Sequence, residues 1–573
     1  MRTARDSFAI ALSAVLFLVL GEAARGAVDV LGVMAAELDR SVEVLSGQSP
    51  QLHFLSYEIT GSEVVSVVAS FGAHSATSRS DSRILDVDLR VGNRDLDNTH
   101  PVREGRGSGF RRPVRTQVPV SDPDALRAAL WRATDRKHRE ATERLARVQA
   151  SVSIQVDEEV QAADFSAEQA VEFIEQPQSI AVDTSAWAER LKRYSAPFGE
   201  ADHIYSGSAV LSATAVTRWY VNSEGARIRT WDTSYRLMVF GSTKADDGMD
   251  LPRFEQFFAF SEDGMPGDEA VMETVGQLID DLRALRAAPV AEPYSGPAIL
   301  SGRATGVFFH EILGHRVEGH RQRRADDAHT FKDMTGESVL PGPFSVVFDP
   351  TVRRAGGSDL AGSFEIDNEG VRGQRVVVID QGVLKRFLMS RRPIEGFSGS
   401  NGHGRKQAGF AAVARQSNLF VEVAEPLPDE TLKERLVDQV RDEGKEYGLF
   451  FDAIQGGVTT TGRGRPNAFN VLPTMVYRIF PDGREELVRG VDLIGTPLTT
   501  FSKIVAGGTQ VEVFNGTCGA ESGGVPVSAI APPVLVSQVE VQRKDKSQQR
   551  LPLLPAPSEA AGVLQPMAPG GIR

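Results

Sequence analysis

Cysteine is nearly absent from this sequence, since Cys518 is the only one among 573 residues. A disulfide within the chain is therefore excluded. A surplus of positive charge is missing as well: 63 Lys and Arg stand against 76 Asp and Glu, which gives a net charge of −13. This balance argues against nucleic acid as a general partner. With 41% hydrophobic and 24% charged residues, the composition is that of a soluble globular protein, and the length predicts two domains.

Long apolar runs are missing beyond the N-terminus, where no segment approaches about 18 uninterrupted apolar residues. The N-terminus itself has Arg2 and Arg5, an apolar run from Phe8 to Leu20, and small residues from Ala23 to Ala27. This order is typical of a signal peptide, and the apolar run is too short to cross a bilayer comfortably. We therefore expect residues 1–26 to be a signal peptide, with an uncleaved anchor as the alternative. The mature protein would then be periplasmic or extracellular.

The residues that follow predict an N-terminal domain of mixed helices and strands over 27–288. Helices are expected near Val28–Leu45, from the capping sequence Ser121–Asp124 to about Gln149, and over Asp268–Arg286. Strands are expected over Leu52–Phe71 and Ile84–Val91, and Tyr205–Phe260 has the pattern of a β-meander with a hairpin turn at Asn222–Gly225. Prolines and glycines after Arg286 mark the domain boundary.

A β-rich C-terminal domain is expected over 289–545, followed by a disordered tail over 546–573. Its strands are predicted at Val376–Ile379, Val383–Leu388, Met475–Phe480, Glu486–Arg489 and Val534–Val541. Leu432, Leu436 and Val440 recur at i, i+4 and i+8 and predict one amphipathic helix. The fold class predicted for the whole chain is α+β.

The chemistry is concentrated in the segment His310-Glu311-Ile312-Leu313-Gly314-His315. Two neutral imidazoles can hold a zinc ion, and Glu311 can then take a proton from zinc-bound water. The usual helical metalloprotease motif places its histidines four positions apart, whereas here they are five apart. On a regular α-helix, five steps of about 100° leave the second histidine roughly 140° from the first. We therefore expect a distorted backbone near Leu313 or Gly314, such as a π-bulge, that aims both imidazoles at one ion.

A catalytic zinc ion needs a third protein ligand and an open position. The candidates are His320, Glu318, His403 in a glycine-rich loop, and Cys518. Cys518 is favoured over His320, because a thiolate is a good zinc ligand and metal binding would explain a single cysteine in an exported protein.

Each of these features also has a plainer interpretation. An isolated pair of histidines occurs by chance, a single cysteine is most often a small buried hydrophobe, and His403 is typical of a surface turn. Arg316, Arg321, Arg323 and Arg324 could bind a carboxylate or an oxyanion, but a solvated helix end is the simpler interpretation.

The segment Phe309–Gly319 resembles the signature of the TldD branch of the TldD/PmbA metallopeptidases. Further segments follow in the same order as in that family: Ser363–Gly370, Gln381–Lys385, Ser400–Arg405, and Cys518-Gly519 followed by Val525–Val527. The turn Asn222–Gly225 is similar to one in the family's N-terminal domain. The resemblance covers most of the chain and is strongest from Gly296 to Gln542. Several motifs in order are more specific than one hexamer.

This resemblance implies a two-domain TldD/PmbA-like architecture, with an N-terminal α/β domain and a β-rich C-terminal metallopeptidase domain. It also implies that zinc is held by His310, His315 and Cys518, with Glu311 as the catalytic base. It also implies a dimer, in which a metal-bearing subunit pairs with a TldE/PmbA-like sibling that lacks the motif and encloses a chamber for unfolded peptides. The TldD/PmbA family members that these motifs resemble are cytoplasmic, whereas this chain has an apparent export signal. Their intracellular substrates are therefore not carried over.

The predicted function is hydrolysis of extended or unfolded peptides by an exported zinc metallopeptidase, with the substrate bound as an added strand at a sheet edge. His403 and Arg405 are the candidates for stabilising the oxyanion. Two alternatives stay open. One is a hydrolase that uses Cys518 as a nucleophile with a histidine base, and the other is a non-catalytic exported binding or assembly protein with a structural metal site.

Overall fold

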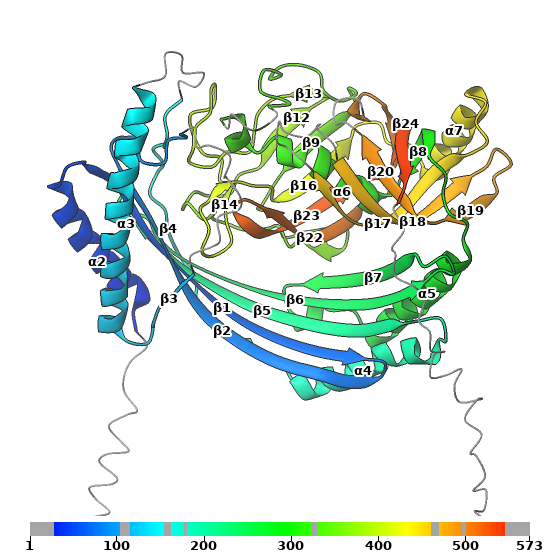
Figure 1. Ribbon diagram of the computed structural model, residues 1–573, viewed down its shortest axis with the longest axis horizontal. Helices are drawn as coiled ribbons and strands as arrows, with labels where there is room; N and C mark the ends of the chain where they lie inside the picture. The colour runs from blue at the N-terminus through cyan, green and yellow to red at the C-terminus, as the bar shows by residue number, and fades with distance from the viewer. Residues whose placement is uncertain are drawn as a thin grey trace, which may run out of the picture.

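The computed structural model describes residues 28–102, 115–153, 162–176, 180–323, 327, 329–459, 469–495 and 500–544. The predicted signal peptide over 1–26 and the predicted tail over 546–573 lie outside these residues. Among the described helices, none is both long and apolar enough to cross a membrane. The N-terminal half forms one long curved sheet, and the C-terminal half lies over the concave side of that sheet (Figure 1).

The N-terminal sheet is built mainly from long antiparallel strands. Its order is β3-β2-β1-β5-β6-β4, and β7 also pairs with β6. The strands are β1 Leu52–Ser70, β2 Ala73–Val91, β3 Thr116–Gln117, β4 Glu172–Ile174, β5 Ser206–Asn222, β6 Arg227–Lys244 and β7 Asp250–Ala259. The helices are α2 Val30–Ser46, α3 Pro123–Val152, α4 Thr184–Glu200 and α5 Asp268–Ala287, with a short 3₁₀ helix, η1, at Glu262–Gly264.

The two faces of this sheet differ, because side chains alternate along each strand. Leu211, Leu237 and Val239 point to the face covered by α4 and α5 and are fully buried there. Residues on the other face, such as Ser212 and Arg236, are only partly buried. This second face looks toward the C-terminal half (Figure 1).

The C-terminal half contains two larger sheets. The first has the order β13-β12-β9-β16-β23-β22, and the second has the order β17-β8-β24-β20-β18-β19, with β21 paired to β24 and with β17 also paired to β18. The strands of the first are β9 Phe344–Phe348, β12 Val376–Asp380, β13 Val383–Leu384, β16 Asn418–Val423, β22 Glu512–Ala520 and β23 Gly523–Ala531. Those of the second are β8 Tyr294–Leu300, β17 Gly448–Thr459, β18 Phe469–Ile479, β19 Glu485–Val488, β20 Val491–Gly495, β21 Ile504–Gly507 and β24 Val534–Arg543.

Helix α6, Gly302–Ile312, lies between these two sheets and contacts β17, β22 and β23. Phe308, Phe309 and Ile312 are fully buried in one core with strands of both sheets. A helix that is apolar on several sides is stable only when neighbours surround it, so this segment belongs in the core. Smaller elements complete the C-terminal half: η2 Gly314–Arg316, η3 Gly319–Gln322, β10 Arg354–Ala355, β11 Ser358–Asp359, β14 Gly404–Arg405, β15 Val413–Ala414 and helix α7 Asp429–Asp442.

Most of the predicted elements are present. Asp122 caps α3 by accepting hydrogen bonds from the backbone of Asp124 and Ala125, and Leu432, Leu436 and Val440 are buried on α7. The prediction of a strand over Val383–Leu388 was too long, because β13 ends at Leu384 and Leu388 instead forms an isolated parallel bridge with Glu318. The domain limits at 27, 288 and 545 stay predictions.

We predict that Phe198→Ala lowers the free energy of unfolding by about 3–5 kcal/mol. Phe198 is fully buried against β5 and β6, where a Cβ on Gly207 would lie 2.2 Å from the Phe198 Cβ atom. Gly207 therefore leaves the space that the Phe198 side chain fills, and removing the Phe198 ring leaves a cavity. Urea unfolding measures the change. Val44→Ala, at a side chain 55% exposed on α2, is the control and should change stability by less than about 0.5 kcal/mol.

Candidate metal centre

The histidine segment begins on α6 and continues into a different kind of helix. Ser301 caps the start of α6, and the α-helix ends at Ile312. Leu313 follows with φ −99° and ψ −54°, and η2 then makes one 3₁₀ turn that contains His315. The predicted distortion near Leu313 and Gly314 is therefore confirmed. The suggested π-bulge is wrong, because the backbone tightens after Ile312 instead of widening.

Gln416 packs against the chain at this point. A Cβ on Gly314 would lie 1.9 Å from the Gln416 Oε1 atom, so the side chain of Gln416 occupies the space beside this glycine. Its Nε2 atom donates to the backbone carbonyl of His310 at 3.2 Å. Gln416 thus fixes the backbone on both sides of the bend.

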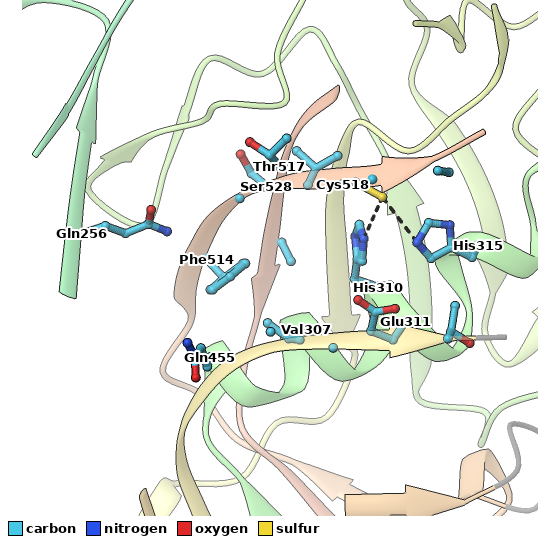
Figure 2. Close-up of a pocket in the computed structure, with 18 of the residues that line it drawn as sticks. Gln256, Val307, His310, Glu311, His315, Gln455, Phe514, Thr517, Cys518 and Ser528 are labelled. Carbon is cyan, nitrogen blue, oxygen red and sulfur yellow. Dashed lines mark hydrogen bonds between the residues drawn. The ribbon is translucent and has the colours of Figure 1, made fainter. Parts of the chain in front are cut away.

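His310, His315 and Cys518 converge on one point (Figure 2). The Sγ atom of Cys518 lies 3.2 Å from Nε2 of His310 and 3.3 Å from Nε2 of His315. One donor atom from each residue lies within 4.8 Å of the other two. The three residues favoured as ligands from the sequence are therefore brought together, although Cys518 is more than 200 positions from His310 in the chain.

The charges at this cluster favour a thiolate. Burial raises the pKa of Cys518. The positive charges of His315 and His310 and their hydrogen bonds have the larger, opposite effect, so the net pKa of Cys518 lies well below its usual value. Burial lowers the pKa of His315, but the Cys518 thiolate and the Glu318 carboxylate raise it more, to about 10. A thiolate is the form of cysteine that binds metal ions.

A second layer of charged residues holds the ligands in place. Glu318 accepts a hydrogen bond from Nδ1 of His315 at 3.3 Å, and its pKa is lowered to about 2, because His315 and Arg321 outweigh the effect of burial. Its Oε1 atom lies 3.3 Å from Nε of Arg415, and both side chains are 0% exposed. Arg415 also donates to the carbonyl of Cys518 at 2.7 Å. Arg415 and Glu318 thus join the strand of Cys518 to the turn of His315, and nothing in the sequence pattern predicted this role for Arg415.

Glu311 follows His310 on α6, and its side chain lies next to β17 at the wall of a cavity (Figure 2). A Cβ on Gly457 of β17 would come within 2.5 Å of the Glu311 Cγ atom, so a glycine is required where the strand crosses this side chain. Arg316 is buried and donates to the carbonyls of Glu311 and Ile312, both at 2.9 Å. These bonds satisfy carbonyl groups at the end of α6 and keep Glu311 in position.

The site opens into a cavity of about 520 Å³ between the two halves of the protein. His310, Glu311, His315 and Cys518 line the cavity on the C-terminal side. Arg236, Phe254 and Gln256 of the N-terminal sheet line the opposite wall, and Figure 2 shows Gln256 across from the cluster. A molecule in this cavity would therefore contact both halves.

The other candidate residues have different places. His320 binds Glu521 at 2.5 Å and is not part of the cluster. His403 is fully buried and not on a surface turn as expected: its Nε2 atom is 3.0 Å from Ser417 Oγ, and burial lowers its pKa to about 3. His403 and Arg405 do not line the cavity, which leaves no contact to support them as oxyanion stabilisers.

The predicted solvated helix end is wrong for the arginines that the structure describes. Arg316, Arg321 and Arg323 are all buried. Arg321 pairs with Glu318 at 2.8 Å, and Arg323 pairs with Asp164 at 2.7 Å. Arg324 lies outside the described residues.

Comparison with known proteins gives a consistent set of relatives. The family described as "PmbA/TldA metallopeptidase C-terminal domain" matches residues 293–543. A metalloprotease of Methanothermobacter thermautotrophicus is 27% identical over 455 residues, which is 77% of this chain and 90% of that protein. A zinc metalloprotease TldD homolog of Saccharolobus solfataricus is 24% identical over 280 residues, which is 46% of this chain and 54% of that protein. The chain thus spans only about half the length of some of these relatives.

Two solved structures share the fold. One, from Thermotoga maritima, is described as a candidate modulator of a DNA gyrase; it has a TM-score of 0.58 and 14% identity, over 88% of this chain and 99% of that one. The other is TldE from Thermococcus kodakarensis, with a TM-score of 0.57 and 11% identity, over 89% of this chain and all of that one. At these identities the likeness shows a common fold, and it confirms the predicted α+β class.

We predict that Cys518 is a thiolate at pH 7 in the folded, metal-free protein. An ordinary cysteine, with a pKa of about 8.5, would be mostly protonated at this pH. The ultraviolet absorbance of the thiolate, taken as the difference between wild type and Cys518→Ser, measures the charge. The signal should be present at pH 7 and should disappear as the pH falls through the lowered pKa. A signal that appears only above about pH 8.5 would contradict the charged pair.

We also predict that Glu318→Gln weakens binding of a divalent transition metal by about 10- to 100-fold, because loss of an outer-layer partner of a metal-binding histidine has effects of this size. The carboxylate that orients His315 is replaced by an amide of the same shape. Competition with a chromogenic chelator measures the affinity. Glu337→Gln, at an exposed residue, is the control and should bind as wild type does. Unchanged affinity in Glu318→Gln would show that the carboxylate does not orient the ligand.

Proposed function

Because this chain is a member of the TldD/PmbA family of metallopeptidases, we propose that it is an exported zinc peptidase that hydrolyses extended or unfolded peptides. The observation that carries the proposal is the convergence of His310, His315 and Cys518 beside Glu311. These residues form a set of metal ligands and a proton acceptor at the wall of a cavity large enough for part of a peptide.

The donor set fits zinc. Imidazole nitrogen and thiolate sulfur are its preferred ligands, and three protein ligands leave a position free for chemistry. The carboxylate of Glu318 on the far nitrogen of His315 is the usual support for such a ligand. The name of the Saccharolobus relative, a zinc metalloprotease, agrees with this choice. Bound here, zinc would supply Lewis acidity to the scissile carbonyl and lower the pKa of a water molecule to about 7.

Glu311 would perform the proton transfers. Its side chain lines the cavity next to His310, and it is 7% exposed. In this position its carboxylate can accept a proton from the attacking water and return it to the leaving amine. Gly457 leaves space for this side chain beside β17, and the hydrogen bond from Arg316 to the Glu311 carbonyl holds its backbone.

Strand β22 offers a place for the peptide. It is the last strand in its sheet order, so one of its edges has no partner strand among the described residues. Phe514, Gly516, Thr517 and Cys518 of this strand line the cavity. A peptide added along this edge would be held through its main chain next to the metal ligands, which gives recognition with little sequence preference.

Export and pairing complete the proposal. The basic and apolar pattern of residues 1–26 supports transport to the periplasm or the outside of the cell. The likeness in fold to TldE supports a dimer, in which this metal-bearing chain pairs with a TldE/PmbA-like sibling.

A cysteine hydrolase is the second candidate, because His310 and His315 each lie within hydrogen-bond reach of the Cys518 sulfur. In that case one histidine would act as the base and the thiolate would attack the carbonyl. The cysteine mechanism leaves Glu311 and the second histidine without a role. A structural metal site in a non-catalytic protein leaves the cavity beside Glu311 without a role.

We predict that Glu311→Gln keeps zinc at a stoichiometry of one and loses at least about 100-fold in peptide hydrolysis, because the amide cannot accept the proton. Cys518→Ala should lose both zinc and hydrolysis. Metal analysis and cleavage of a fluorogenic unfolded peptide measure the two properties. Full hydrolysis by Glu311→Gln would show that Glu311 is not the general base.

Chelation and alkylation separate the alternatives. A chelator should abolish cleavage, and zinc should restore it, if the ion is catalytic. Inhibition by a thiol reagent with no effect of the chelator would support the cysteine hydrolase. Zinc content with no cleavage of any unfolded peptide, alone or with a sibling subunit, would support a structural site.

A further inference from the structure

Arg236 of β6 is a charged residue in the cavity that neither the metal cluster nor the proton transfers use. It lines the same cavity as His310, Glu311 and Cys518, but from the opposite wall. It lies on the half-buried face of the N-terminal sheet, since its register partners are Ser212 on β5 and Phe258 on β7. A side chain in this position faces whatever molecule fills the cavity.

The guanidinium has no acidic partner among the residues that the structure describes. Its contacts are a hydrogen bond from NH1 to the Gln256 side-chain oxygen and the ring of Phe258, 5.5 Å away. Burial lowers the pKa of Arg236, with no nearby carboxylate to raise it again. Arg321, the other arginine of the cavity, is by contrast neutralised by Glu318 and Glu521. A partly buried cation without a counter-charge is stabilised when an anion binds.

Gln256 fixes this cation relative to the metal ligands. Its side-chain oxygen accepts from Arg236, and its side-chain nitrogen donates to the backbone carbonyl of Asn515. Asn515 is on β22, three positions before Cys518. The guanidinium is therefore connected through one glutamine to the strand that carries a ligand, and Figure 2 shows Gln256 reaching from its strand toward the cavity.

Small side chains follow Arg236 across the sheet. Ser212 is its neighbour across β5, and Ser66 is the neighbour of Ser212 on β1. Both serines are only partly buried and have short side chains with a hydroxyl group. Of these three residues only Arg236 lines the cavity, so the guanidinium is the donor among them that a carboxylate in the cavity would meet.

We propose that Arg236 forms a carboxylate-binding subsite that positions the substrate of the proposed peptidase, a claim that rests on the proposed function. The bound group is either the C-terminal α-carboxylate of a peptide or the side chain of Asp or Glu. A planar guanidinium can hold either with two parallel hydrogen bonds. Binding of the α-carboxylate would make the enzyme cleave near peptide C-termini, and binding of a side chain would make it select acidic residues.

Peptide binding to the full-length, zinc-loaded Glu311→Gln variant tests the subsite without requiring hydrolysis. One pair of short peptides differs only in a C-terminal carboxylate or carboxamide. A second pair has amidated C-termini and differs only in one internal Glu or Gln. In one of the two pairs, the carboxylate form should bind about 10- to 100-fold more tightly. The pair that shows the difference identifies the source of the carboxylate.

Introducing Arg236→Gln into the same variant should remove this preference, and Arg236→Lys should keep part of it, because it retains the charge but loses the planar fork. Arg79→Gln, which removes one exposed cation from the same sheet, should leave it unchanged. Metal content and melting temperature check that each variant is folded. In the enzyme with Glu311 intact, Arg236→Gln should raise KM and change kcat little.

Equal binding within both pairs would overturn the subsite, and so would a preference that persists undiminished in Arg236→Gln. In the second case the carboxylate would be bound elsewhere, for example by the metal. A failure of the proposed function would be seen separately, as the absence of peptide cleavage by the wild type. The binding measurements do not require cleavage, so the two failures can be told apart.

Discussion

The buried pair of Glu318 and Arg415 is the interaction on which the site depends. Arg415 reaches the carbonyl of Cys518, and Glu318 reaches His315, so the pair connects two parts of the chain that are far apart in sequence. Both side chains are buried away from water. In the protein interior a charge without a partner costs several kcal/mol. If Glu318 moved, Arg415 would have no other ion pair among the described residues, whereas Glu318 without Arg415 would still pair with Arg321. His315 and Cys518 are therefore held close together by contacts within the protein.

This arrangement explains how a single cysteine can be kept ionised in a buried place. Cys518 is 4% exposed, and burial alone would favour its neutral form. The two imidazoles reverse this preference, and the Glu318 carboxylate stabilises the charge on His315. The negative charge of Glu318 is shared in turn with Arg321 and Arg415. Charge alternates from the ligands outward, and this pattern lets the ionised groups exist together inside the protein.

The sequence predicted those features that depend on local patterns. Helix α7 follows from the spacing of Leu432, Leu436 and Val440, α3 follows from its cap at Asp122, and the five-residue spacing of the histidines required a bend. The kind of bend was not predictable from the spacing, and neither was its neighbour Gln416, which reaches Gly314 from a distant segment. For the same reason Arg415 had no signal in the sequence, and His403 was misplaced on the surface. Contacts between segments far apart in the chain decide these positions, and periodicity does not report them.

The cavity is built from two halves with separate chemical duties. The C-terminal half supplies the cluster and Glu311, whereas the N-terminal sheet supplies a wall with Arg236, Phe254 and Gln256. The strands of that wall are stabilised by the opposite, helix-covered face, where Leu237 and Val239 are buried. A substitution at a cavity-facing position such as Arg236 therefore leaves the buried core of the sheet unchanged. An architecture of this kind allows the residues of the N-terminal wall to change while the cluster and Glu311 on the other half stay constant.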